Sequence, residues 1–246
     1  MLRSVQSLIG YVILATDGEI GNVTDLYFDD GTWEIRYAVV ETGTLVSRHQ
    51  VLLSPVVFTK TQWKEMKIPT LLNREQVENS PDIETDRPVS RQNEIRLHSY
   101  YGWPYYWSVA SPDYVPPPTP ISMTRTEETE PDPEKANEHL RSYGELLNYT
   151  LHATDGDLGY VEDFIIDDAE WIVQYLVVNT RSWLPGRKVL IAPRWVREIS
   201  WSESSVHVDM DKESVKHSPE YDPREAVNRE YEMRLYDYYG RPKYWE

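Results

Sequence analysis

Large apolar side chains recur at every second position along several short stretches of the chain. Between residues 33 and 41, Trp33, Ile35 and Tyr37 alternate with polar or small neighbours. A period of two is typical of a strand with one buried face, so this stretch is predicted to be a β-strand. Similar patterns predict strands at 11–15, 20–29, 45–46 with 51–53, 183–184 with 189–191, and 205–210. Short strands separated by Gly, Asp and Pro predict a small barrel or sandwich.

A tight turn at Asp17-Gly18 is predicted between the first two strands, because this pair tolerates the positive φ that a hairpin turn requires. The turn recurs at Asp155-Gly156, and an offset of 138 residues aligns the two halves of the chain without a gap. Trp33 then matches Trp171, and the aromatic residues at the end of each half also match. The chain is therefore predicted to contain two copies of one module.

The spacing of apolar residues changes towards the end of each copy. Four-residue steps lead from Val89 to Leu97 and from Val227 to Leu235, which predicts a short amphipathic helix in each copy. The predicted N-caps are Ser90 and Asn228, and the predicted C-terminal stops are Gly102 and Gly240. Both copies then end in the aromatic sequence Tyr-Tyr-Gly-x-Pro-x-Tyr-Trp.

A proline-rich, acidic segment separates the two copies, and it includes an acidic run from Glu127 to Glu130. Such a composition favours an extended, solvated linker. The predicted domains are module 1 at residues 1–107, the linker at 108–138 and module 2 at 139–246. Each module is expected to be a small β-barrel followed by a short helix and an aromatic tail.

The chain has a formal net charge of −16, and each of these three segments is acidic. Phosphate binding depends on Lys and Arg, so this balance argues against nucleic acid and anionic membranes as partners. No apolar run reaches the roughly 18 residues needed to cross a bilayer, and no signal-peptide core follows Met1. We therefore expect a cytoplasmic protein without membrane insertion. The absence of cysteine excludes disulfides and thiolate chemistry.

The motifs from Leu8 to Asp25, the aromatic-led strand from Trp33 to Val40 and the Val-Leu-Leu-Ser-Pro ending together resemble the PRC-barrel family. The resemblance covers roughly residues 2–85 and 140–222, and the second copy is the more typical. It implies a small, strongly bent β-barrel. Such barrels occur in the cytoplasmic part of the photosynthetic reaction-centre H subunit and in the C-terminal domain of the ribosome maturation factor, and in neither setting is the barrel catalytic. The sequence shows neither the membrane helix of the H subunit nor the other domain of the maturation factor, so we expect that neither function carries over intact.

Carboxylates gather around the predicted turns. They are Asp17, Glu19 and Asp25 in the first copy and Asp155, Asp157, Glu162 and Asp163 in the second. Alternating carboxylates suit a hard cation such as Ca²⁺, but an Asp beside Gly already has a role in the turn, and no full twelve-residue calcium loop is present. We therefore predict turns and no metal site. Asp29-Asp30 and Asp167-Asp168 are likewise predicted to form turns rather than acid–base pairs.

No residue pattern predicts catalysis. The histidines lack the spacing of a helical metal site and are expected at the surface; they are His49, His98, His139, His152, His207 and His217. The chain also lacks the Gly-x-Ser-x-Gly sequence, a phosphate-binding loop and a dinucleotide-binding glycine pattern. We therefore expect neither an enzyme nor a bound cofactor.

The aromatic tails are the candidate partner-binding residues, because Tyr and Trp combine apolar area with a polar group and are frequent in interfaces. These residues are Tyr100, Tyr101, Tyr106 and Trp107 in module 1 and Tyr238, Tyr239, Tyr244 and Trp245 in module 2. Alternatively, each tail packs on its own module or on the sister module. The ungapped repeat favours the sister, with the modules paired as a homodimer would be.

Two functional hypotheses follow. The preferred one is a non-enzymatic scaffold or adaptor that binds a protein partner through the paired barrels, with a homo-oligomer as a further option. The alternative is a small-ligand or metal-sensing module with a site between the barrels.

Overall fold

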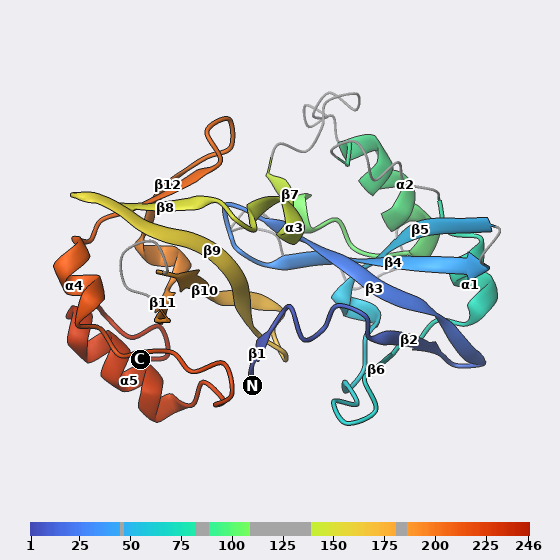
Figure 1. Cartoon of the computed structure of the whole chain (residues 1–246). Helices are drawn as coiled ribbons and strands as arrows, with labels where there is room; N and C mark the ends of the chain where they lie inside the picture. The colour runs from blue at the N-terminus through green and yellow to red at the C-terminus, as the bar shows by residue number, and fades with distance from the viewer. Residues whose placement is uncertain (45–46, 82–88, 109–138, 181–185) are drawn as a thin grey trace.

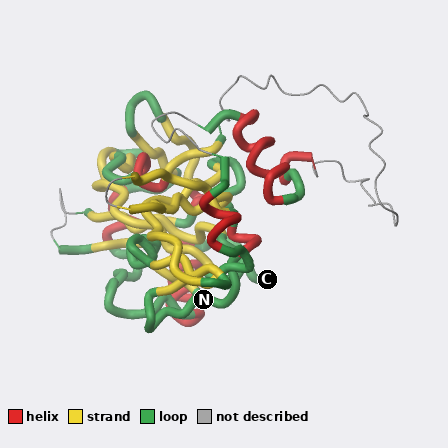
Figure 2. The backbone as a smooth tube through the Cα atoms, turned by 90° about the vertical axis from the view of Figure 1, so that its right-hand side faces the viewer, coloured by secondary structure: helices red, strands yellow, loops and turns green. Residues whose placement is uncertain are grey.

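The computed structural model describes residues 1–44, 47–81, 89–108, 139–180 and 186–246. It contains two bent β-sheets, and helices lie at the edges of the resulting β-rich body (Figures 1 and 2). The sheet of module 1 contains β2 (Val12–Ala15), β3 (Gly18–Asp29), β4 (Ile35–Thr44), β5 (Ser47–Leu53) and β6 (Lys67–Pro69). The sheet of module 2 contains β8 (Thr150–Ala153), β9 (Gly156–Asp167), β10 (Ile172–Asn179), β11 (Lys188–Ile191), β12 (Val196–Ser200) and β13 (Ser205–Val208). The predicted mainly β fold with two β-rich modules is confirmed.

The strands in each sheet follow the same topology. Their order is β5-β4-β3-β2-β6 in module 1 and β11-β10-β9-β8-β13-β12 in module 2. Within the described residues, the strand pairs form an open series rather than a closed ring. The expected strands at 45–46 and 183–184 lie outside the described residues, as does the linker from residue 109 onward.

The first strand of each module belongs to the sheet of the other module. β1 (Leu2–Ser4) pairs antiparallel with β9, and β7 (Leu140–Ser142) pairs antiparallel with β3. The β3–β4 and β9–β10 turns also meet reciprocally: Ile35 N donates to Trp171 O at 2.7 Å, and Val173 N donates to Trp33 O at 2.9 Å. The two modules are therefore joined about a pseudo-two-fold axis by an exchange of strands.

A single buried apolar cluster extends across this junction and includes residues of both modules. The rings of Phe28 and Phe164, one from each module, meet edge to face with centroids 5.3 Å apart. Val5 and Leu146, from the segments that follow the exchanged strands, are fully buried in the same cluster. Unfolding either module would therefore expose apolar surface of the other.

The hairpin predicted at Asp17-Gly18 forms the β2–β3 connection, and Gly18 has a φ of 148°. The Asp17 carboxylate also accepts from the backbone N of Arg74 at 2.8 Å, at the start of helix α1 (Arg74–Glu78). Three residues beyond the turn, a Cβ on Gly21 would lie 2.0 Å from the carbonyl oxygen of Glu41, so only glycine fits there. This close approach explains the second glycine of the repeated turn motif.

Helices α2 (Arg91–Tyr101) and α5 (Arg229–Tyr239) occupy the predicted positions. Their N-caps are Ser90 and Asn228, and their C-caps are the left-handed Gly102 and Gly240, as the sequence predicted. The smaller helical elements are α3 (Tyr143–Leu146), α4 (Lys212–Lys216), η1 (Pro55–Val57), η2 (Tyr106–Ser108) and η3 (Pro193–Trp195).

The prediction that each aromatic tail packs on the other module is wrong. Tyr100 donates to the carbonyl oxygen of Gln76 at 2.8 Å, and Tyr238 donates to that of Ser214 at 2.7 Å, in each case within one module. The left-handed glycine at the end of each helix turns the tail back onto its own helix. The N-terminal strands, rather than the tails, cross between the modules.

Candidate partner-binding site

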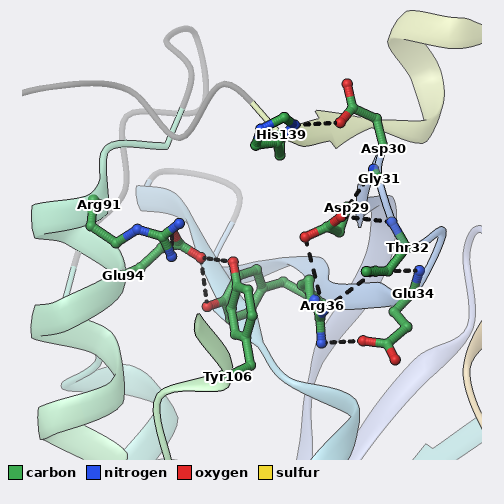
Figure 3. Close-up of polar contacts among 11 residues, drawn as sticks. Asp29, Asp30, Gly31, Thr32, Glu34, Arg36, Arg91, Glu94, Tyr106 and His139 are labelled. Atoms are coloured by element: carbon green, nitrogen blue, oxygen red, sulfur yellow. Dashed lines mark hydrogen bonds and ion pairs between the residues drawn. The ribbon is translucent and has the colours of Figure 1, made fainter. Parts of the chain in front are cut away.

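A buried carboxylate holds the tail of module 1 to its helix and sheet. Glu94 lies on α2 with no exposed surface. Its Oε1 accepts from the hydroxyl of Tyr37 on β4 at 3.0 Å and from that of Tyr106 in the tail at 2.6 Å. Arg91 lies 3.0 Å from Oε2, and Figure 3 shows Arg91, Glu94 and Tyr106 converging. A buried carboxylate requires hydrogen-bonding and charged partners of this kind. We call Tyr37, Arg91, Glu94 and Tyr106 the module 1 clasp.

The tyrosines of this clasp are hydrogen-bond donors rather than acid–base groups. Burial and the neighbouring Glu94 raise the pKa of Tyr37 well above its usual range, and the same two causes raise the pKa of Tyr106. Both hydroxyls therefore stay protonated near neutral pH. The geometry supports a structural role for the clasp.

Module 2 contains the same clasp at the matching positions. Tyr175 and Tyr244 each donate to Glu232 Oε1 at 2.8 Å, and Arg229 lies 3.1 Å from Oε2. Sequence reasoning missed both buried glutamates. The Arg-x-x-Glu spacing at the start of each predicted helix, Arg91 to Glu94 in the first copy, is the signal that could have revealed them.

His98 has no counterpart in the second clasp, where Tyr236 occupies its position. Its Nδ1 lies 2.9 Å from the carbonyl oxygen of Pro104, which can only accept, so Nδ1 donates there. In the neutral ring, Nε2 is then an acceptor 2.7 Å from the Tyr37 hydroxyl, so the one proton of that hydroxyl is shared between Nε2 and Glu94 Oε1. Burial lowers the pKa of His98, although its bond to Pro104 opposes this shift.

The expectation that all histidines lie at the surface is therefore wrong for His98, which is 4% exposed. The other described histidines are half-buried or exposed. His152 and His207 stack with ring centroids 5.0 Å apart, and His139 lies 2.9 Å from a carboxylate oxygen of Asp30. These contacts do not bring the histidines together as metal ligands in the part of the chain that the structure describes.

Arg36 connects the module 1 clasp to the β3–β4 turn. Its guanidinium lies 4.0 Å from the centre of the Tyr106 ring, forms an ion pair with Glu34 and lies 3.8 Å from Asp29 (Figure 3). Asp29 in turn accepts from the backbone N of Gly31 and Thr32, as expected for a turn-forming residue.

A groove with a volume of about 390 Å³ lies beside this clasp. One wall is the tail of module 1, and the opposite wall is the β9–β10 turn of module 2. Its lining includes Val56, His98, Trp103, Tyr105, Tyr106 and Trp171. A second cavity, of about 700 Å³, lies between the β3–β4 turn and module 2 and is lined by residues that include Asp30, Trp33, His139, Arg194, Arg197 and Trp201.

Two of the carboxylates considered for a cation instead join the modules. Asp163 accepts from Ser4 Oγ at 2.5 Å, Gln6 N at 3.0 Å and Tyr143 OH at 2.9 Å. Asp25 accepts from Ser142 Oγ at 2.5 Å and Gly144 N at 3.1 Å. Burial raises the pKa of both carboxyls, and these hydrogen bonds oppose the shift.

The other carboxylates of that set are separate from one another. Asp155 accepts from the backbone N of Lys212 at the start of α4, just as Asp17 accepts from that of Arg74 at the start of α1. The remaining three pair with basic side chains: Glu19 with Lys67, Asp157 with His152 and Glu162 with Lys188, and Glu162 also accepts from Asn179 Nδ2 at 3.4 Å. Among the described residues, no three metal-binding side chains converge.

The eight candidate tail residues divide into two groups. Tyr100 and Tyr238 are each 42% exposed, whereas the other six are partly covered by their own modules. The half-buried residues are Tyr101, Tyr106, Trp107, Tyr239, Tyr244 and Trp245. The tails therefore present limited aromatic surface, and the groove beside the module 1 tail includes Trp171, which the sequence did not suggest.

Fold and site together define a duplicated, mainly β protein whose two copies exchange their first strands. Residues 2–70 match the family model of the PRC-barrel domain, which supports the resemblance that the sequence motifs indicated. The match does not include module 2, which repeats the strand order of module 1. A comparison with curated proteins found no match to the chain. None of the described helices has both the length and the apolar character required to span a membrane.

Proposed function

We propose that this chain is a non-enzymatic scaffold or adaptor that binds a protein partner through its paired β-modules. The strand exchange is the observation that carries the proposal. Since β1 completes the sheet of module 2 and β7 completes the sheet of module 1, the pair acts as one body. A rigid body of this type presents surfaces that contain residues of both modules, and binding then requires little ordering of the protein.

Four carboxylates that are buried or half-buried support the same proposal. Glu94, Glu232, Asp25 and Asp163 each accept several hydrogen bonds from neighbouring groups. A catalytic acid or base needs access to a substrate proton, and these carboxylates are instead used within the fold. A cytoplasmic location is part of this proposal, since it agrees with the lack of cysteine and with the acidic composition.

The test is affinity capture from the native host with the full chain as bait, and with residues 1–107 and 139–246 as separate baits. We expect a protein that the full chain retains and that neither half retains. The recombinant partner should then bind the full chain with 1:1 stoichiometry in calorimetry. Failure of the full chain to enrich any protein specifically would contradict the proposal.

The second candidate function is small-ligand or metal sensing between the modules, and the cavity of about 700 Å³ favours it. On the opposite side of the pseudo-axis, Phe58 packs against Trp171 with ring centroids 5.3 Å apart. The matching residue beside Trp33 is the smaller Val196, which leaves space for the cavity. A thermal-shift screen with metals and small anions tests this candidate. A ligand that binds in the cavity should raise the melting temperature of the parent chain but not that of Arg197→Ala.

A further inference from the structure

The groove between the module 1 tail and module 2 has a surface that its repeat counterpart lacks. Three lining residues are Val56, Trp103 and Tyr105, and their counterparts in module 2 are Arg194, Arg241 and Lys243. The four clasp residues themselves are the same in both modules, so the difference lies in the residues around the clasp. Module 2 thus has charged residues at the positions where module 1 has apolar and aromatic ones.

The charged counterparts are used by module 2 itself. Lys243 lies 3.1 Å from a carboxylate oxygen of Asp237, and Arg241 donates to the carbonyl oxygen of Asp209 at 3.3 Å. The Arg194 guanidinium lies 4.6 Å from the centre of the Tyr244 ring. In module 1, by contrast, Val56 leaves 62% of its surface exposed at the groove. Exposed apolar surface of this kind, next to aromatic rings, is typical of an interaction site.

The groove is continuous with the interface between the modules. Its floor includes Ile35 and Tyr37 on β4, and its far wall includes Trp171. The same Trp171 accepts the backbone hydrogen bond from Ile35 N across the pseudo-axis. This hydrogen bond connects the two sides of the groove, and a groove of about 390 Å³ suits a short extended segment rather than a large surface.

The charge of the groove selects among such segments. Glu170 is an exposed lining residue, and it forms no ion pair with any described residue. Its counterpart in module 1 is the neutral Thr32. Arg36, the arginine of the lining, is already paired with Glu34, so the rim has a free negative charge within a chain of net charge −16. Aromatic rings in this tail also accept guanidinium groups, as Arg91 lies 4.1 Å from the centre of the Trp107 ring.

We propose that this groove binds a short extended segment of a partner protein in which Arg or Lys stands next to apolar residues. The apolar side chains pack between Val56, Tyr105 and Trp171, and the basic side chain lies at Glu170. This inference rests on the proposed scaffold function and specifies the surface and the partner chemistry. The acidic net charge opposes a second copy of the chain as occupant, since the two copies would repel each other.

The probe is a phage-displayed library of short random peptides, selected on the full-length protein. We expect enriched peptides to contain Arg or Lys beside Leu, Pro or an aromatic residue. The best enriched peptide, labelled with fluorescein, should bind with 1:1 stoichiometry. The double variant Val56→Arg with Tyr105→Lys, which introduces the module 2 residues, should reduce the affinity for this peptide by about 10-fold or more. Glu170→Lys should weaken it to a similar extent.

Met66→Ser is the matched control. Met66 is 52% exposed, lies outside the groove lining and has Ser204 as its counterpart with a nearly identical φ. This variant should bind the peptide as the parent chain does. Unchanged melting temperatures of all variants show that a loss of binding reflects the groove itself.

The inference is overturned if no peptides are enriched, if the enriched peptides are acidic, or if the double variant binds the peptide as well as the parent chain does. Self-association of the parent chain that the double variant abolishes also overturns it, because a second copy would then be the occupant. If the double variant still captures the native partner, the groove is the wrong surface while the scaffold function stands. If the full chain captures no partner at all, the scaffold function itself fails.

Discussion

The clasps of the two modules contain the same buried residues, but their surroundings differ. In both, a helix glutamate accepts from a strand tyrosine and a tail tyrosine and pairs with an arginine. Around this shared framework, His98 faces Tyr37 where Tyr236 faces Tyr175, and Tyr105 stands where Lys243 does. The comparison separates two roles: the shared residues hold each tail in place, and the residues that differ give each module its own surface and chemistry.

The largest loss of stability is expected at the junction between the two modules, where the exchanged strands meet. Asp163→Ala removes the acceptor for Ser4, Gln6 and Tyr143 in a site where Asp163 is 6% exposed. The free energy of unfolding should fall by about 3–4 kcal/mol, since several buried donors lose their partner. Urea unfolding measures this change. Asp25→Ala is the matched variant. It should lower the free energy of unfolding by less than Asp163→Ala does, because Asp25 is more exposed and has no hydrogen bond equivalent to the one from Tyr143 to Asp163.

The next effect distinguishes the two clasps. Tyr37→Phe removes the hydroxyl proton that Glu94 and His98 share and leaves both buried acceptors without this donor, so the free energy of unfolding should fall by about 2–3 kcal/mol. Tyr175→Phe removes one bond to Glu232 and should cost about 1–2 kcal/mol. Urea unfolding of the two variants under one set of conditions compares them. Equal losses in the free energy of unfolding would show that the contact with His98 does not stabilise the module 1 clasp.

A smaller effect concerns pH and only module 1. Burial, together with Arg91 and Arg36, lowers the pKa of His98 below its ordinary value of 6.5. The hydrogen bond from His98 to Pro104 opposes this shift. Glu94 is the carboxylate of the same hydrogen-bond network. The unfolded chain therefore takes up this proton at a higher pH than the folded chain does. This contribution to stability is fully present above pH 6.5 and is lost as the pH falls through the lower folded-state pKa.

His98→Tyr installs the module 2 residue and should remove this pH dependence. Urea midpoints of the parent chain and the variant, measured between about pH 5 and 7, compare the two. Parallel pH profiles for the two proteins would contradict the role assigned to His98. The exposed His217 provides the control, since His217→Tyr should leave the profile unchanged.

The smallest effect is expected for metal addition. The turn carboxylates of both modules are already bonded, as Asp17 is to Arg74 N and Asp155 is to Lys212 N. Millimolar Ca²⁺ should therefore shift the melting temperature by less than about 1 °C, and Asp17→Asn should not alter that result. A saturable shift that Asp17→Asn or Asp155→Asn abolishes would restore the cation site.

Much of the fold could be predicted because its signals are local. The Asp17-Gly18 hairpin, the helix caps and the offset of 138 residues all depend on residues close in sequence or on simple repetition. The strand exchange could not be predicted, because Leu2–Ser4 has the same pattern whether it pairs with β3 or with β9. Pairing within a module and pairing across modules bury the same face of the strand.

The site was predicted less well, for a related reason. The sequence shows that the tails are aromatic, but their packing depends on Glu94 and Glu232, which in the sequence look like ordinary helix-surface residues. His98 is buried because Tyr37, distant in sequence, and Pro104 contact its two ring nitrogens and the aromatic tail packs around its ring. Trp171 reaches the groove only through the contact between the modules. Sequence periodicity contains none of these long-range contacts.

The strand exchange is the central claim, and recombining the two halves tests it most directly. Residues 1–107 and 139–246 are produced separately and then mixed, so that β1 and β7 must find their sheets in the other fragment. We expect each fragment alone to melt well below the intact chain, and the mixture to form a 1:1 complex with one cooperative transition. If each fragment instead melts at the temperature of the intact chain and the two do not associate, the modules are independent and the account is wrong.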